Sequence, residues 1–156
     1  MHAMRTFGAG ALVLAVALAP LQAFACTLVL QTPGTLRNSM DNTVLGSEVN
    51  GNTPATVNAL LALFESPTIQ VSAPSRITPP PAGYNTAAET VQVRYTAGVI
   101  AGGGLADQPY TSSTTSFPLG LLGLVTVSMT VHSRILNANG FAAGTYTTRT
   151  VVTCHP

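Results

Sequence analysis

Two segments of this 156-residue chain alternate strictly between apolar and polar residues, and they constrain the fold more than any other feature. In the segment 89–97 the apolar set is Val91, Val93, Tyr95 and Ala97. In the segment 125–132 it is Val125, Val127, Met129 and Val131. Successive side chains of a β-strand point to opposite faces, so both segments predict strands with one buried and one exposed face.

Shorter segments of the same kind lie between turns rich in Gly, Pro and Asn, at residues 27–31, 36–39, 44–48, 68–73 and 144–154. Together the segments predict an all-β domain, a single antiparallel β-sandwich of about seven or eight short strands. Residues 53–65 fit either a helix or a buried strand, and we favour the strand because the surrounding chain is strand-like. Residues 79–83 and 102–116 are predicted to be loops.

The N-terminus has the three parts of a secretory signal peptide: a basic residue at Arg5, an apolar run over 7–19, and small residues at Ala23 and Ala25. We therefore expect a signal peptide over 1–25 and one β-sandwich domain over 26–156. This predicts a protein exported to the periplasm, the cell surface or the medium. The apolar stretch 119–131 is interrupted by glycines and then alternates, so we expect no membrane span.

The mature chain would have two cysteines, Cys26 at its start and Cys154 near its end. In an exported protein an even count favours pairing, and we predict a disulfide between them. The alternative is a bacterial lipoprotein with its lipid on Cys26, although Ala23 stands where such proteins usually have Leu. The two hypotheses exclude each other, because a lipidated Cys26 would leave Cys154 without a partner.

Charged residues make up only 7% of the chain, with six Arg, no Lys and five acids. A near-neutral chain without basic clusters offers no electrostatic surface for nucleic acid. Its polarity comes instead from Thr and Ser, which suit a pleated sheet surface. Few charges guard the sheet edges, which leaves pairing with another copy or with other surface proteins open at those edges.

The residue inventory argues against an enzyme, because we find no nucleophile with a base, no carboxylate pair and no metal-ligand spacing. His132 and His155 are interpreted as surface residues, and no cofactor or metal is expected. If the protein binds a small ligand or a glycan, Tyr84 and Tyr110 are the best candidates for the rim of the site, because both lie in predicted loops.

The ending Ala143-Gly144-Thr145-Tyr146, followed by the alternating residues 150–153, resembles the last strand of secreted pilin-like domains of the spore coat U and fimbrial subunit type. The resemblance covers about a dozen residues at this end and a few at Cys26. It implies an immunoglobulin-like fold and a place at the cell surface or in a fibre. Strand-exchanging subunits carry a free alternating extension before the first strand, whereas Cys26 opens the predicted mature chain. The sequence therefore favours a self-completed domain.

Three functional classes remain, and a non-enzymatic protein with a structural or adhesive role at the cell surface, in a fibre or in a coat is favoured. The alternative is a periplasmic ligand- or glycan-binding module, in which Tyr84, Tyr110 and the 102–116 loop would form the rim. A small hydrolase is the least favoured.

Overall fold

The computed structural model describes residues 26–61, 66–100, 102–120 and 125–156. The predicted signal peptide and residues 62–65 of the ambiguous segment lie outside these ranges. The strands are β1 (Cys26–Thr32), β2 (Arg37–Asn38), β3 (Val44–Gly46), β4 (Ala55–Leu61), β5 (Thr68–Val71), β6 (Ser75–Arg76), β7 (Glu89–Val99), β8 (Gly104–Thr111), β9 (Thr115–Pro118), β10 (Thr126–Asn137), β11 (Thr148–Arg149) and β12 (Val152–His155). Two short 3-10 helices, η1 (Val49–Gly51) and η2 (Thr86–Ala88), connect strands.

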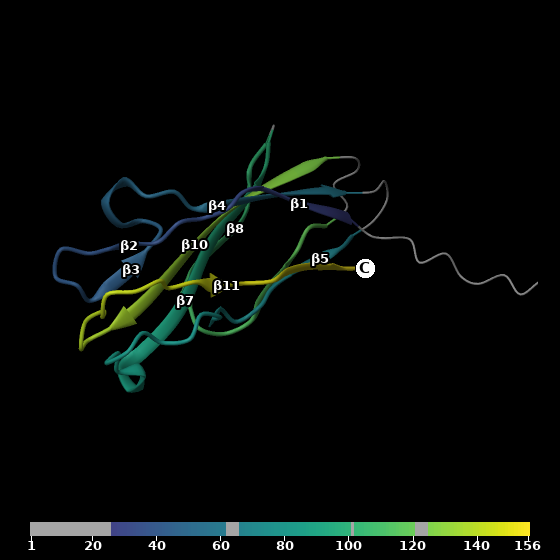
Figure 1. Cartoon of the computed structure of the whole chain (residues 1–156). Helices are drawn as coiled ribbons and strands as arrows, with labels where there is room; N and C mark the ends of the chain where they lie inside the picture. The colour runs from purple at the N-terminus through teal and green to yellow at the C-terminus, as the bar shows by residue number, and fades with distance from the viewer. Residues whose placement is uncertain (1–25, 62–65, 101, 121–124) are drawn as a thin grey trace, which may run out of the picture.

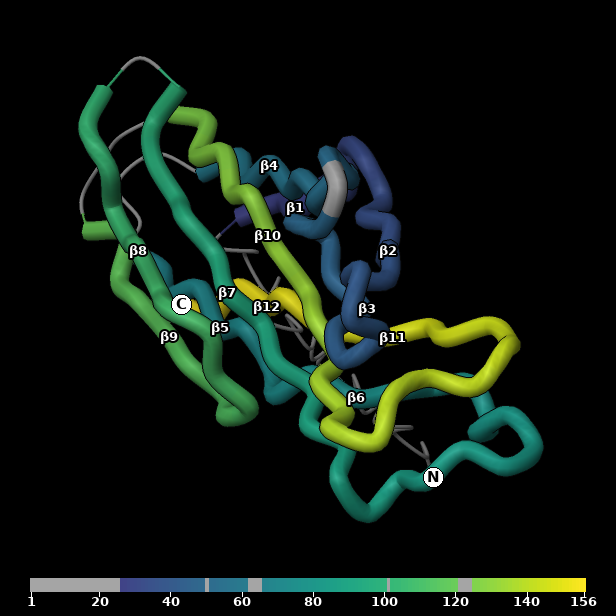
Figure 2. Tube along the Cα trace, turned by 90° about the vertical axis from the view of Figure 1, so that its left-hand side faces the viewer, coloured from purple at the N-terminus to yellow at the C-terminus, as the bar shows by residue number. Residues whose placement is uncertain are grey.

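Strand β10 is the centre of a large antiparallel sheet (Figure 2). On one side it pairs with β4 through its first half and with β3 through its second half. On the other side it pairs with β7 along 127–137, and β8 pairs with β7. Beyond β4 lies β1, and beyond β3 lies β2. The edges of this sheet are therefore β8 on one side and β1 with β2 on the other.

A second layer lies against one face of this sheet (Figure 1). It contains the antiparallel set β12-β5-β9 and the short pair β11-β6. Since β11 follows β10 after a turn and leads into β12, the chain changes layer at residues 138–147. The start of β1 and the C-terminus lie at the same end of the molecule (Figure 1).

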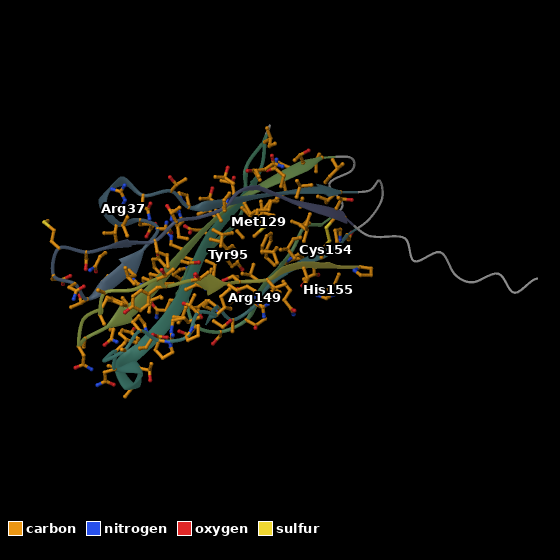
Figure 3. All side chains as sticks on the ribbon, in the orientation of Figure 1. Arg37, Tyr95, Met129, Arg149, Cys154 and His155 are labelled. Atoms are coloured by element: carbon orange, nitrogen blue, oxygen red, sulfur yellow. A yellow bond between two sulfur atoms is a disulfide. The ribbon has the colours of Figure 1, made fainter. Side chains whose placement is uncertain are left out.

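The core fills the space between the two layers, and the inward residues of both alternating segments other than Val91 lie in it or pack against it. Tyr95 on β7 is 1% exposed and Met129 on β10 is fully buried, and both lie between the layers in Figure 3. From the second layer, Ile69 and Val71 are also fully buried. The prediction of an all-β chain with antiparallel sheets is confirmed.

Three details differ from or refine the sequence-based expectation. The segment 102–116, predicted as a loop, contains all of β8 and the start of β9. Edge strand β8 contacts the core through Leu105 and Ala106 only, so it needs no alternating pattern. The long last strand predicted over 144–154 is divided into β11 and β12, with 144–147 outside both. The ambiguous segment 53–65 forms strand β4 over 55–61, as favoured. Within the described ranges, no helix is long and apolar enough to cross a membrane.

Candidate functional site

The disulfide joins an edge strand of each layer. Cys26 opens β1 at the edge of the large sheet, and Cys154 lies in β12 of the second layer. Their sulfur atoms are bonded, with 6.2 Å between the Cα atoms and 128 positions between them in the sequence. The predicted disulfide is confirmed. It uses the Cys26 sulfur that the lipoprotein alternative requires, and it fixes β1 beside β12 at one end of the molecule.

A groove of about 520 Å³ lies between the same two edges, on the side of β1 and β11–β12. One wall consists of Leu30 and residues 33–36, which follow the large sheet's edge. The other wall consists of residues 146–150 and Val152. Core residues form the floor, among them Val57, which is 8% exposed, and Val131, which is 6% exposed. The groove is therefore an opening into the core, lined mainly by apolar atoms.

Leu30 is far more exposed than its place on the inward face of β1 would predict. In β1, Cys26 and Leu28 lie packed against the core, and Leu30 shares their face because it follows Leu28 by two positions. An inward leucine is normally covered, yet 60% of Leu30 is exposed. It faces the groove, where the described part of the chain places nothing over it.

Both walls of the groove are strand edges that lack a second partner among the described residues. Strand β1 pairs with β4 only, and β12 pairs with β5 only. Such an edge presents backbone N–H and C=O groups that another strand can pair with. The self-completed domain expected from the sequence therefore stays a prediction.

A charged cluster lies on the opposite, outer face of the large sheet. We call it the outer-face cluster, and it consists of Glu48, Arg94, Tyr110, His132 and Arg134. Glu48 is its centre: one carboxylate oxygen accepts from Arg94 Nη1 at 2.9 Å and lies 3.5 Å from His132 Nδ1. The other oxygen accepts the Tyr110 hydroxyl at 2.8 Å, and the Arg134 guanidinium covers the Tyr110 ring at 3.8 Å from its centroid.

Burial governs the ionisation of this cluster. It lowers the pKa of His132 below its usual 6.5, with Glu48 opposing and Arg94 adding to the shift. Burial also raises the pKa of Tyr110, and its hydrogen bond to Glu48 raises it further. At neutral pH, His132 is therefore neutral and Tyr110 keeps its proton, so the cluster holds one carboxylate and two guanidinium groups.

Tyr84 and Tyr110, the sequence's candidates for a ligand rim, contact different neighbours. Tyr110 lies on β8 in the outer-face cluster rather than in a loop. Tyr84 packs against Phe141 and Tyr146, with ring centroids 5.8 and 5.2 Å away. Burial raises the pKa of Tyr84 to about 12. Neither tyrosine lines the groove.

Several residues that shape these sites were not named as site candidates from the sequence. Tyr146 lines the groove, packs on Tyr84 and donates from its hydroxyl to the Ala142 carbonyl at 2.9 Å. The Gly-Thr-Tyr motif that contains Tyr146 was the sequence signal that could have identified it. Glu48 and Leu30 had no local signal, because each depends on which strands become neighbours.

The Nε2 atom of His155 lies 3.0 Å from the Thr153 hydroxyl oxygen, near the end of β12. In the described ranges no three His, Cys, Asp or Glu residues lie close enough together to hold a metal ion. Comparison of the chain with protein-family models, with curated proteins and with solved structures gave no match.

Proposed function

We propose that this protein is an exported, non-enzymatic protein with a structural or adhesive role at the cell surface, in a fibre or in a coat. It would act by binding an extended segment of a partner chain in the groove between β1 and β11–β12. The observation that carries the proposal is Leu30, an inward-facing residue left 60% exposed between two strand edges.

The strand order supports an immunoglobulin-like sandwich with one position open. In the seven-stranded form, one sheet has the order A-B-E-D and the other contains C, F and G. Here β1-β4-β10-β7 corresponds to the first sheet, and β5 with β12 corresponds to C and F. Strand G would pair with the second edge of β12, which borders the groove. The Tyr146 hydrogen bond to Ala142 fits the tyrosine corner of such sandwiches, at the start of strand F.

A strand added at this place would gain two kinds of interaction. Its backbone would pair with an unpartnered edge, and its alternate side chains would enter the apolar groove. Burying the exposed three-fifths of Leu30 alone contributes about 1–2 kcal/mol. Interactions of this kind suit stable assembly of chains, and the resemblance of the C-terminal residues to pilin-like domains points to the same use.

The test compares Leu30→Ser with Leu60→Ser. Leu60 is a matched control because it is 49% exposed, but it lies between buried Ala59 and Leu61 on β4 and so points to the outer face. The full chain is expressed with its leader, and the exported, ¹⁵N-labelled protein is titrated by NMR with a capped peptide of the sequence of residues 125–131, which alternates as a partner strand should.

We expect saturable shifts in residues of the groove walls, and a dissociation constant raised about 5- to 30-fold by Leu30→Ser but unchanged by Leu60→Ser. Absence of binding at millimolar peptide, or equal effects of the two substitutions, would refute the proposal.

A ligand- or glycan-binding module is the second candidate, and the outer-face cluster favours it. Arg134 donates to Gln92 and covers Tyr110, and no carboxylate of the described residues lies within 4 Å of its guanidinium. Binding of an oligosaccharide that Arg134→Ala abolishes and Leu30→Ser leaves intact would favour this candidate.

A further inference from the structure

One charged residue lines the groove, and it has no acidic partner. Among the residues that form the groove walls and floor, Arg149 on β11 is the charged one. Its backbone pairs with Ser75 of β6, while its side chain is exposed (Figure 3). Within the described residues, no carboxylate lies within 4 Å of its guanidinium.

The side-chain carboxylates elsewhere in the described chain either have partners of their own or lie far from Arg149. Glu48 binds Arg94 and Tyr110 on the outer face, and Glu89 binds Arg76 at 2.9 Å. Asp41 accepts from Ser39 and Thr43 in the turn between β2 and β3. Asp107 lies on β8, at the opposite edge of the large sheet. The positive charge at the groove is therefore left for a group that the described chain does not supply.

The geometry of strand addition determines where that group would lie. A strand paired with the free edge of β11–β12 places one residue directly opposite Arg149 on the same face, with Cβ atoms about 4.5–5.5 Å apart. Arg149 and Val151 lie on the outward side of this segment, and Val151 is 45% exposed. Val152, the first residue of β12, faces the core. The added strand thus faces apolar groups on its inner side and a cation on its outer side.

We propose that the natural occupant of the groove is an acidic β-segment of a partner chain: apolar residues alternate on its inner face, and an Asp or Glu on its outer face pairs with Arg149. This inference rests on the proposed function, because it names the chemistry of the partner that the groove binds. Opposite charges across neighbouring strands change a dissociation constant by about 1.5- to 5-fold, so the pair selects a partner rather than creating the affinity.

The experiment uses two peptides based on residues 125–131, in which Thr126, Ser128 and Thr130 are all replaced by Glu or all by Gln. Because these positions alternate, every register with the apolar residues facing inward puts a substituted residue opposite Arg149. Both peptides are titrated against the exported wild-type protein, Arg149→Gln, Arg149→Glu and Arg37→Gln. Arg37 is a matched control, because it is an exposed Arg on β2 that does not line the groove.

We expect the Glu peptide to bind wild type about threefold more tightly than the Gln peptide, a preference that Arg149→Gln abolishes, Arg149→Glu reverses and Arg37→Gln retains. If Arg149→Gln binds the Gln peptide as tightly as wild type does, the substitution has left the groove intact. Equal binding of the two peptides by wild type, or the same loss of preference in Arg37→Gln, would overturn the inference while leaving the proposed function in place. If neither peptide binds, the proposed function itself fails.

Discussion

Removing the disulfide is the perturbation whose magnitude follows most directly from the structure. Cys26 and Cys154 are 128 positions apart, so the bond closes almost the whole described chain into one loop. For a loop of this size, the loss of chain entropy in the unfolded state corresponds to about 5 kcal/mol at 25 °C. Native disulfides contribute about 2–5 kcal/mol when measured, so we expect the double variant Cys26→Ser/Cys154→Ser to lose that much unfolding free energy.

The assay is equilibrium unfolding in urea, followed by circular dichroism, on the purified wild-type protein with its disulfide formed and on the double variant. Both substitutions are made together, because a single one leaves a reactive thiol. Wild type unfolded with a reductant present should match the double variant, and the reductant should leave the double variant unchanged. A loss below about 1 kcal/mol with an unaltered m value would show that the unfolded-state argument does not apply to this chain.

Three further predictions concern single side chains. Glu89→Gln should lower the unfolding free energy by about 3 kcal/mol, as measured by urea unfolding. The reason is that the Arg76 side chain, which is only 13% exposed, would lose its carboxylate partner. Tyr146→Phe should cost about 1 kcal/mol in the same assay, through loss of its hydrogen bond to the Ala142 carbonyl, and an unchanged midpoint would contradict this. Because the pKa of His132 is lowered in the folded state, the folded protein binds fewer protons than the unfolded one, so stability should fall as the pH drops below about 6.5. Thermal unfolding between pH 8 and 5 should show this fall, and His132→Gln should reduce it.

The buried faces of the central strands could be predicted from sequence because their environment is the same along their length. Strand β10 is paired on both sides, and its inward residues Val127 and Met129 are fully buried as the alternation indicates. The disulfide was predictable for another reason, since two cysteines allow one intramolecular pair. Edge strand β8 was missed, because its pairing with β7 depends on backbone groups that carry no sequence signal.

The candidate sites could not be predicted from the sequence because they depend on which strands lie next to each other. Glu48 follows β3, and it reaches Arg94 and Tyr110 only because β10 brings β3 to one of its sides and β7 to the other. Leu30 lies in a segment that the sequence predicts as a strand, but its exposure depends on the place of β11–β12. Periodicity identifies which face of a strand is apolar and cannot tell whether another strand covers it.

The distribution of the few charges links the fold to the proposed binding mode. A chain with 7% charged residues places Arg76 with Glu89 and Arg94 with Glu48, and each of these pairs joins two different segments of the chain. These charges are satisfied within the described chain, so they hold the fold together and offer little to a partner. The groove has the opposite character, with an uncovered leucine, unpaired backbone edges and the cation of Arg149. If the groove binds a partner strand as proposed, binding energy and selectivity would be concentrated on this side, and association there should be sensitive to substitutions that leave the rest of the fold unaffected.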